Sequence, residues 1–229
     1  MFDRLPKLKV PIAIGIVWLF HISALIGVYM GYFDWFIEKT PLNLWLCLLL
    51  FLYVYPLNQT KQIIAFAFFF IGGMFAEWLG VNYSLLFGTY EYGSNFGPKL
   101  DGVPLLIGCY WAILTFITAS ILDYTPFNIW IKALLGASLM VIMDFFMEHS
   151  APTFDFWTFE GNIVPLQNYG TWFLIALLFH GILRILQIEG NRPFSLNVYL
   201  AQLLFFACFY FYFFNSGRGF IPFQFPIDL

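Results

Sequence analysis

Hydrophobic positions fall into seven long runs separated by shorter polar stretches. The runs lie at Pro11–Tyr32, Leu42–Tyr55, Gln62–Leu79, Val103–Leu122, Phe127–Phe146, Tyr169–Leu186 and Leu196–Phe214. About 20 apolar residues in helical form cross the hydrocarbon core of a bilayer. The first run reaches about 33 Å at about 1.5 Å per residue, whereas the second is short. The pattern predicts an all-α bundle of about seven transmembrane helices.

Composition supports a lipid environment for the whole chain. Of the 229 residues, 61% are hydrophobic and only 10% are charged, whereas about a quarter of a soluble domain is charged. We therefore expect one integral membrane domain over residues 1–229, with the bilayer as its solvent. The net charge is −3 and no basic patch appears, so nucleic acid is not an expected partner. Nothing in the pattern predicts an oligomeric state.

Lysine and arginine positions predict the orientation. With seven spans, seven of the ten basic residues share the side of the N-terminus: Arg4, Lys7, Lys9, Lys61, Lys132, Arg184 and Arg192. Cytoplasmic loops are enriched in such residues. We expect a protein of the cytoplasmic (inner) membrane with its N-terminus inside and its C-terminus outside.

Two long polar connections, Gly80–Gly102 and Glu148–Asn168, fall together on the outer side. All but three of the thirteen acidic residues, Asp3, Asp123 and Glu189, belong to that side or its helix ends. Loops of this length in a compact domain are often functional. We expect the two loops to fold together and cap a pocket between the third, fourth, fifth and sixth helices.

The strongest chemical signal is Asp144 with Glu148 and His149 at the end of a hydrophobic run. Residues four apart share one face of a helix. Two acids in a low-dielectric site favour a carboxyl group that keeps its proton, as a general acid must. A metal site is a weaker alternative, because Glu77 would have to complete it in space. Acids tied to loop N–H groups are a purely structural alternative.

The first loop adds Glu77, an acid within a membrane helix and so a functional candidate. Tyr90, Glu91 and Tyr92 follow in a short extended segment, where tyrosine can line an apolar pocket and donate a hydrogen bond. An interfacial carboxylate and an aromatic belt are the structural alternatives. We expect Asp101 to cap the following helix.

The second loop leads into the sixth helix and contributes Trp157, Gln167, Asn168 and Trp172. Gln167 and Asn168 could hold a water molecule or bond the acids. The three histidines are too few for a di-iron oxygenase, and the chain has no phosphate-binding loop or dinucleotide fingerprint. These features favour acid/base chemistry on a hydrophobic substrate, without a metal, redox cofactor or nucleotide.

The residues that carry a family resemblance lie between about Glu77 and Leu186. They are Glu77 with Gly80, Phe87-Gly88-Thr89-Tyr90-Glu91-Tyr92, Gly102-Val103-Pro104-Leu105 with Trp111, and Asp144, Trp157, Gly161, Val164-Pro165, Asn168 and Trp172. In these the chain resembles the membrane carotenoid 1,2-hydratases, which include bisanhydrobacterioruberin hydratase and γ-carotene 1'-hydratase. It departs from that pattern at Glu148-His149-Ser150-Ala151-Pro152, where the family has a proline directly after the acid.

The resemblance implies addition of water to the terminal C1=C2 bond of an acyclic carotenoid such as lycopene or γ-carotene. From the chemistry of this reaction we expect Asp144 or Glu148 to protonate the alkene and Glu77 to orient water. Asn168, Tyr90 and Tyr92 would assist, with Trp157 near the carbocation. A membrane lycopene or isoprenoid cyclase, which begins with the same protonation, and a non-catalytic carotenoid-binding protein are the alternatives.

Overall fold

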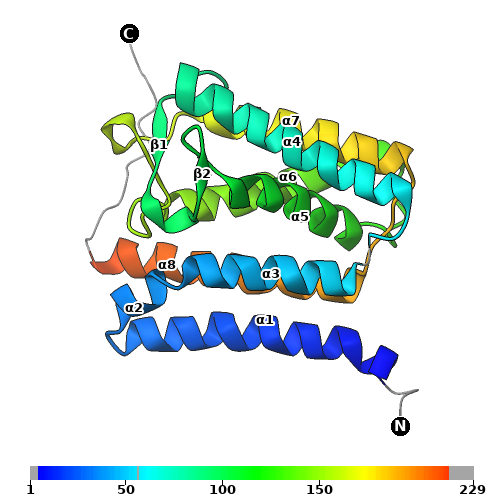
Figure 1. Ribbon diagram of the computed structural model, residues 1–229, viewed down its shortest axis with the longest axis horizontal. Helices are drawn as coiled ribbons and strands as arrows, with labels where there is room; N and C mark the ends of the chain where they lie inside the picture. The colour runs from blue at the N-terminus through cyan, green and yellow to red at the C-terminus, as the bar shows by residue number, and fades with distance from the viewer. Residues whose placement is uncertain (1–4, 56, 217–229) are drawn as a thin grey trace.

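The protein is a bundle of roughly antiparallel helices with a small β structure at one end (Figure 1). The computed structural model describes residues 5–55 and 57–216. Four residues used in the charge analysis lie outside these ranges, namely Asp3, Arg4, Arg218 and Asp228, as does Pro56. In the described chain the long helices are α1 (Leu5–Tyr29), α3 (Thr40–Val54), α4 (Thr60–Tyr83), α5 (Leu105–Ile121), α6 (Ile129–Glu148), α7 (Leu166–Ile185) and α8 (Arg192–Ser216). Each corresponds to one predicted run, which confirms the all-α membrane bundle.

Five segments of the described chain are long and apolar enough to cross a membrane: Leu8–Tyr29, Phe33–Val54, Thr60–Tyr83, Ile129–Glu148 and Arg192–Tyr212. The second includes the short helix α2 (Phe33–Ile37), which lies in the predicted connection between the first two runs and was not predicted as a helix. Helix α5 is apolar but shorter, with 17 residues. Together these helices identify an integral membrane protein.

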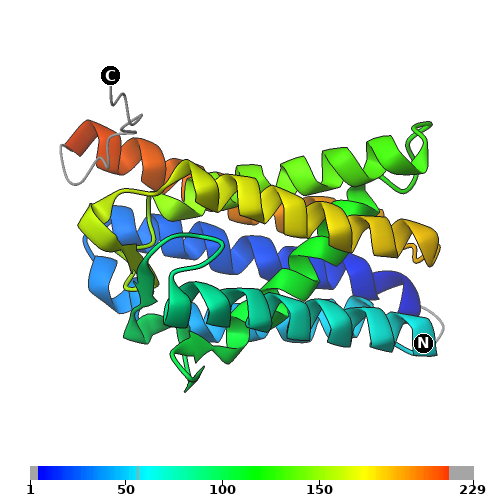
Figure 2. The same cartoon turned by 90° about the horizontal axis from the view of Figure 1, so that it is seen from above.

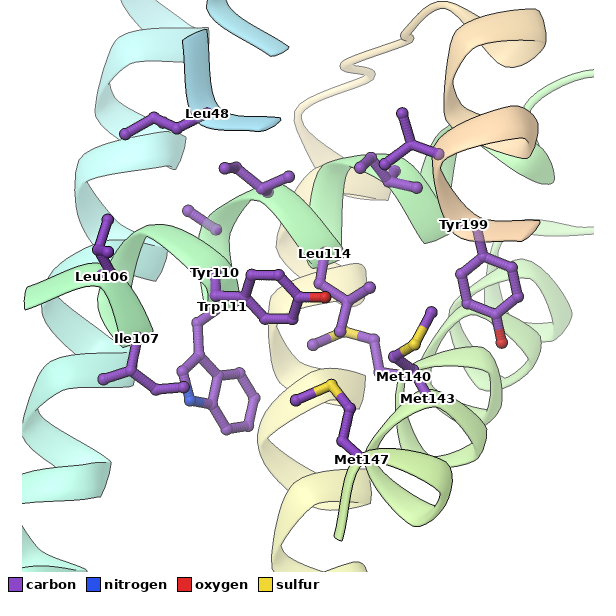
Figure 3. Packing of buried hydrophobic residues seen from close by; sticks show 14 of the residues in the cluster. Leu48, Leu106, Ile107, Tyr110, Trp111, Leu114, Met140, Met143, Met147 and Tyr199 are labelled. Atoms are coloured by element: carbon purple, nitrogen blue, oxygen red, sulfur yellow. The ribbon is translucent and has the colours of Figure 1, made fainter. Parts of the chain in front are cut away.

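Helix α5 forms the centre of the bundle. It packs against α3, α4, α6, α7 and α8, and nearly all its side chains are buried. Figure 1 shows it between α4 and α7 on one side and α3 and α8 on the other, with α1 beyond α3. On one side, Met140, Met143 and Met147 of α6 pack with Tyr110 and Leu114 of α5 (Figure 3). Close packing around α5 fixes the relative positions of the helices that end at the loops.

Local signals set several helix ends. Asn128 caps α6, because its side chain accepts hydrogen bonds from the backbone N–H groups of Trp130 and Ile131 at 3.0 Å. Helix α4 ends at Ser84, which adopts a left-handed conformation with φ 52°. Helix α5 begins after Pro104 without a side-chain cap. The predicted capping role of Asp101 is therefore wrong; its Oδ2 accepts a hydrogen bond from Trp78 Nε1 at 2.5 Å.

The two long loops meet through paired strands. Strand β1 (Tyr90–Tyr92) pairs antiparallel with β4 (Trp157–Phe159), opposing Tyr90 to Phe159 and Tyr92 to Trp157. A second pair joins β2 (Lys99–Leu100) to β3 (Val103–Pro104). Figure 2 shows both loops gathered at one end of the bundle. The prediction that the loops fold together is confirmed.

Candidate functional site

Six elements converge beneath the paired loops. The last turns of α4 and α6, the first turns of α5 and α7, and strands β1 and β4 surround a small buried cavity. It is lined by Glu77, Phe87, Tyr90, Tyr92, Ile107, Asp144, Glu148, Trp157, Phe159, Asn168 and Trp172. Its volume is about 20 Å³, and one water molecule needs about 10–15 Å³ of such space. The cavity has room for about one water molecule.

Three carboxyl groups lie in the wall of this cavity. Glu77, Asp144 and Glu148 have 3%, 1% and 2% of their surfaces exposed. The ion pairs of the described chain, Glu38 with Lys39 and Asp123 with Arg184, involve none of the three. Burial of unpaired carboxylates is costly, so hydrogen-bond donors or protons must compensate their charge.

Glu77 receives hydrogen bonds from three side chains. Tyr90 and Tyr92 donate to its Oε2 at 2.5 and 2.8 Å, and Trp111 Nε1 donates to its Oε1 at 2.8 Å. Burial, followed by the negative charge of Glu77, raises the pKa of both tyrosine hydroxyls well above the ordinary value. Both tyrosines therefore keep their protons and remain donors.

Glu148 and Asp144 share a donor on α7. Asn168 Nδ2 lies 2.9 Å from Glu148 Oε1 and 3.1 Å from Asp144 Oδ2. Trp157 Nε1 donates to Glu148 Oε2 at 2.6 Å. Asp144 Oδ1 is buried and has no hydrogen-bond partner among the described residues. Glu77 therefore accepts hydrogen bonds from three side chains, Glu148 from two and Asp144 from one.

Aromatic rings form much of the remaining wall. Trp172, which lines the cavity, stacks on Trp111 with ring centroids 3.7 Å apart and planes at 15°. Tyr90 packs against Phe159 and Tyr92 against Trp157, with centroids 5.1 and 6.0 Å apart. Such faces are electron-rich and suit a cationic species more than an anion.

Most predicted site residues come together here, but three do not. Glu91 lies between the two buried tyrosines of β1 and is exposed, as alternation along a strand requires. Gln167 is exposed on the first turn of α7. His149 is half-buried at the end of α6, where its Nδ1 contacts the Phe145 carbonyl and its ring packs against Tyr210. Burial lowers the pKa of His149, which favours a neutral ring.

Trp111, Phe87, Ile107 and Phe159 complete the site although none was a predicted site residue. A usable signal exists for Trp111, since a tryptophan buried in an apolar helix needs an acceptor for its N–H. The apolar residues carry no such signal.

Oxygens of all three acids already accept hydrogen bonds from side chains, and those oxygens are the atoms that a metal ion would need. No group of three or more His, Cys, Asp and Glu side chains in the described ranges is placed to hold a metal ion. The site as arranged can instead donate a proton, accept one, and hold a small polar molecule beside aromatic faces.

Comparison with known proteins identifies the family. The family model described as "Carotenoid biosynthesis protein" matches residues 40–224, which is most of the chain and includes every residue of the cavity wall. Searches of curated proteins and of solved structures find no match.

Proposed function

Because the chain belongs to the carotenoid biosynthesis protein family, we propose that it hydrates the terminal C1=C2 bond of an acyclic carotenoid end group. A role in carotenoid biosynthesis follows from the family; the reaction is our inference. The observation that carries it is the cavity itself, in which three buried carboxyl groups surround space for one water molecule. Hydration needs a proton donor, one water molecule and a proton acceptor, and this wall contains candidates for each.

Asp144 is the proposed proton donor. It has one donor partner, whereas Glu77 has three, so it is the carboxyl group least supported as an anion. Its proton adds to C2 as the C1=C2 electron pair forms the new C–H bond, leaving a tertiary carbocation at C1. The oxygen of water then bonds to C1, and its surplus proton returns to a carboxylate of the site. The sum is alkene plus water giving a tertiary alcohol.

Glu77 and Glu148 are proposed to orient the water and stabilise the cation. Glu77 is held by hydrogen bonds from Tyr90, Tyr92 and Trp111, so its carboxyl group is fixed in place before the reaction begins. The ring of Trp172 or Trp157 would add about 0.5–2 kcal/mol of cation–π stabilisation. The substrate class proposed is an acyclic end of the lycopene or γ-carotene type.

The test is the intact mass of the pigment after expression in a host that makes lycopene. Hydration adds 18 mass units per reacted end, as the mass of water requires. Unchanged mass with a new ring would indicate a cyclase instead, and unchanged pigment bound in stoichiometric amount would indicate a binding protein. Either result would overturn the hydratase assignment.

We also propose that the cavity end of the bundle faces outward across the cytoplasmic membrane. Lys61, Lys132 and Arg184 lie toward the opposite end, as expected for the cytoplasmic side. A cysteine introduced at Leu85 or Thr89, both exposed in the first loop, should react with an impermeant maleimide in intact cells. Labelling only after lysis would reverse the orientation.

A further inference from the structure

A second and much larger cavity lies beside the acid site. It measures about 310 Å³ and is bounded by α1, α2, α3 and α8, with Tyr110 of α5 and Met147 of α6 also in its lining. The lining is mostly aromatic and aliphatic. Tyr110 Oη donates to Gln202 Oε1 at 2.9 Å, so these two polar groups satisfy each other. We call this space the side pocket.

We propose that the side pocket binds the acyclic isoprenoid end of a carotenoid and delivers it to the acid cavity. This inference rests on the proposed function and adds where the substrate is held and how it enters. The acid cavity, at about 20 Å³, has room for water but not for a branched hydrocarbon end. The alkene must therefore reach Asp144 from an adjoining space.

One layer of side chains separates the two spaces. Met147 lines the side pocket and directly precedes Glu148 of the acid cavity. Phe96, also in the side pocket, has its ring centroid 6.1 Å from that of Tyr92 and 6.0 Å from that of Trp157. The side pocket and the acid cavity therefore lie on opposite sides of a shared wall of side chains.

Met147 is the side chain best suited to move aside. Methionine is unbranched and adapts its shape at low cost. Figure 3 shows Met147 extending from α6 toward Tyr110 and Trp111 of α5, and Trp111 itself donates to Glu77. A rotation of Met147 is the movement by which we propose that the two spaces join beside the acids.

The rim of the side pocket supports entry from lipid. Phe20, Trp35 and Leu42 line the pocket and are 40%, 56% and 60% exposed. They belong to segments that can cross a membrane. A polyene dissolved in the bilayer can therefore approach this opening without passing through water.

The experiment fills the pocket without touching the acids. Ala24 of α1 lines the side pocket, and Ala24→Trp places an indole inside it. Leu44→Trp fills the same space from α3. Ala67→Trp, on the exposed surface of α4 outside the pocket, is the matched control for added bulk. Each variant is compared at equal amounts of monodisperse, helical protein in detergent.

Product formation should fall at least tenfold in Ala24→Trp or Leu44→Trp and stay within twofold in Ala67→Trp. A second readout is pigment that co-purifies with the inactive variant Asp144→Asn; adding Ala24→Trp should remove it. If wild type hydrates and both pocket variants hydrate equally well, the side pocket is not the substrate site although the proposed function stands. If wild type yields no hydrated product, the function fails, and co-purified pigment still decides whether the pocket binds polyene.

Discussion

Replacing Asp144 by Asn should abolish activity while leaving the fold intact. Asp144 Oδ2 accepts one hydrogen bond from Asn168 at 3.1 Å, and Oδ1 has no partner in the described chain. Asparagine has the same shape, keeps an oxygen for Asn168 and brings no charge into the buried site. Since one retained hydrogen bond is the main contact, the free energy of unfolding should change by less than about 1 kcal/mol. Loss of a general acid should slow product formation by about 10²–10⁴-fold.

Asp123→Asn, at the opposite end of the bundle, is the matched control. Asp123 Oδ1 lies 2.5 Å from Arg184 and its Oδ2 accepts from the Gly190 N–H at 2.9 Å. The two charged side chains are 1% and 8% exposed. Breaking such a buried pair costs about 3–5 kcal/mol because the other charge is left uncompensated. This variant should lose stability and keep its activity per folded molecule.

The assay measures both properties on the same purified samples. Product is quantified by mass spectrometry per unit of folded protein in liposomes loaded with lycopene, and unfolding is followed by circular dichroism in detergent. Hydration by Asp144→Asn at more than about a tenth of the wild-type rate would refute its role as proton donor. Unfolding of Asp144→Asn at the temperature of Asp123→Asn would show that its role is structural.

Three further predictions concern the loops. Gly80→Ala places a Cβ 2.6 Å from Tyr90 Oη, so we expect at least tenfold less product, whereas Gly170→Ala, with open space around it, should match wild type. Glu91→Gln should change the rate by less than twofold and unfolding by less than about 0.5 kcal/mol, because the side chain is exposed; a larger loss of rate would place Glu91 in the site. A hydrogen bond from the Ser94 side chain lowers the pKa of Asp155, so its stabilisation of the loops is present above about pH 4 and lost as the pH falls further. The protection of the loop amides from hydrogen exchange, relative to the unfolded chain at the same pH, should fall on acidification, and should fall less in Asp155→Asn.

The helices could be predicted because a bilayer imposes a simple requirement on the sequence of a segment that crosses it. A segment that crosses a bilayer must be apolar and helical, so hydropathy alone locates it. The extended segment at β1 was predicted, but its partner β4 was not, because that pair is set by contact between two loops far apart in the sequence. The short α2 and the pair of β2 with β3 were not predicted either. Tertiary pairing of this kind leaves little trace in a two- or three-residue segment.

The acids of the site could be predicted, but not all of their neighbours. Glu77, Asp144 and Glu148 stand out because charge is rare in such a chain. Asn168 and Trp172, four residues apart, share a face of α7, whereas Gln167 lies about 100° away on the helix and is exposed. Helical and strand periodicity, applied strictly, would have separated Gln167 and Glu91 from the site. That Trp111 donates its hydrogen bond to Glu77 could be seen only in the folded structure.

The central position of α5 has a consequence for biosynthesis. Its 17 residues extend about 26 Å, less than the roughly 30 Å of a bilayer core, and almost none of its side chains face outward. Of its packing partners, α3 and α4 are translated before it, whereas α6, α7 and α8 are translated after it. Until α8 leaves the ribosome, α5 is a membrane segment without its final surroundings. The packing around α5 is therefore completed late, and chains truncated before α8 should be substrates for membrane quality control.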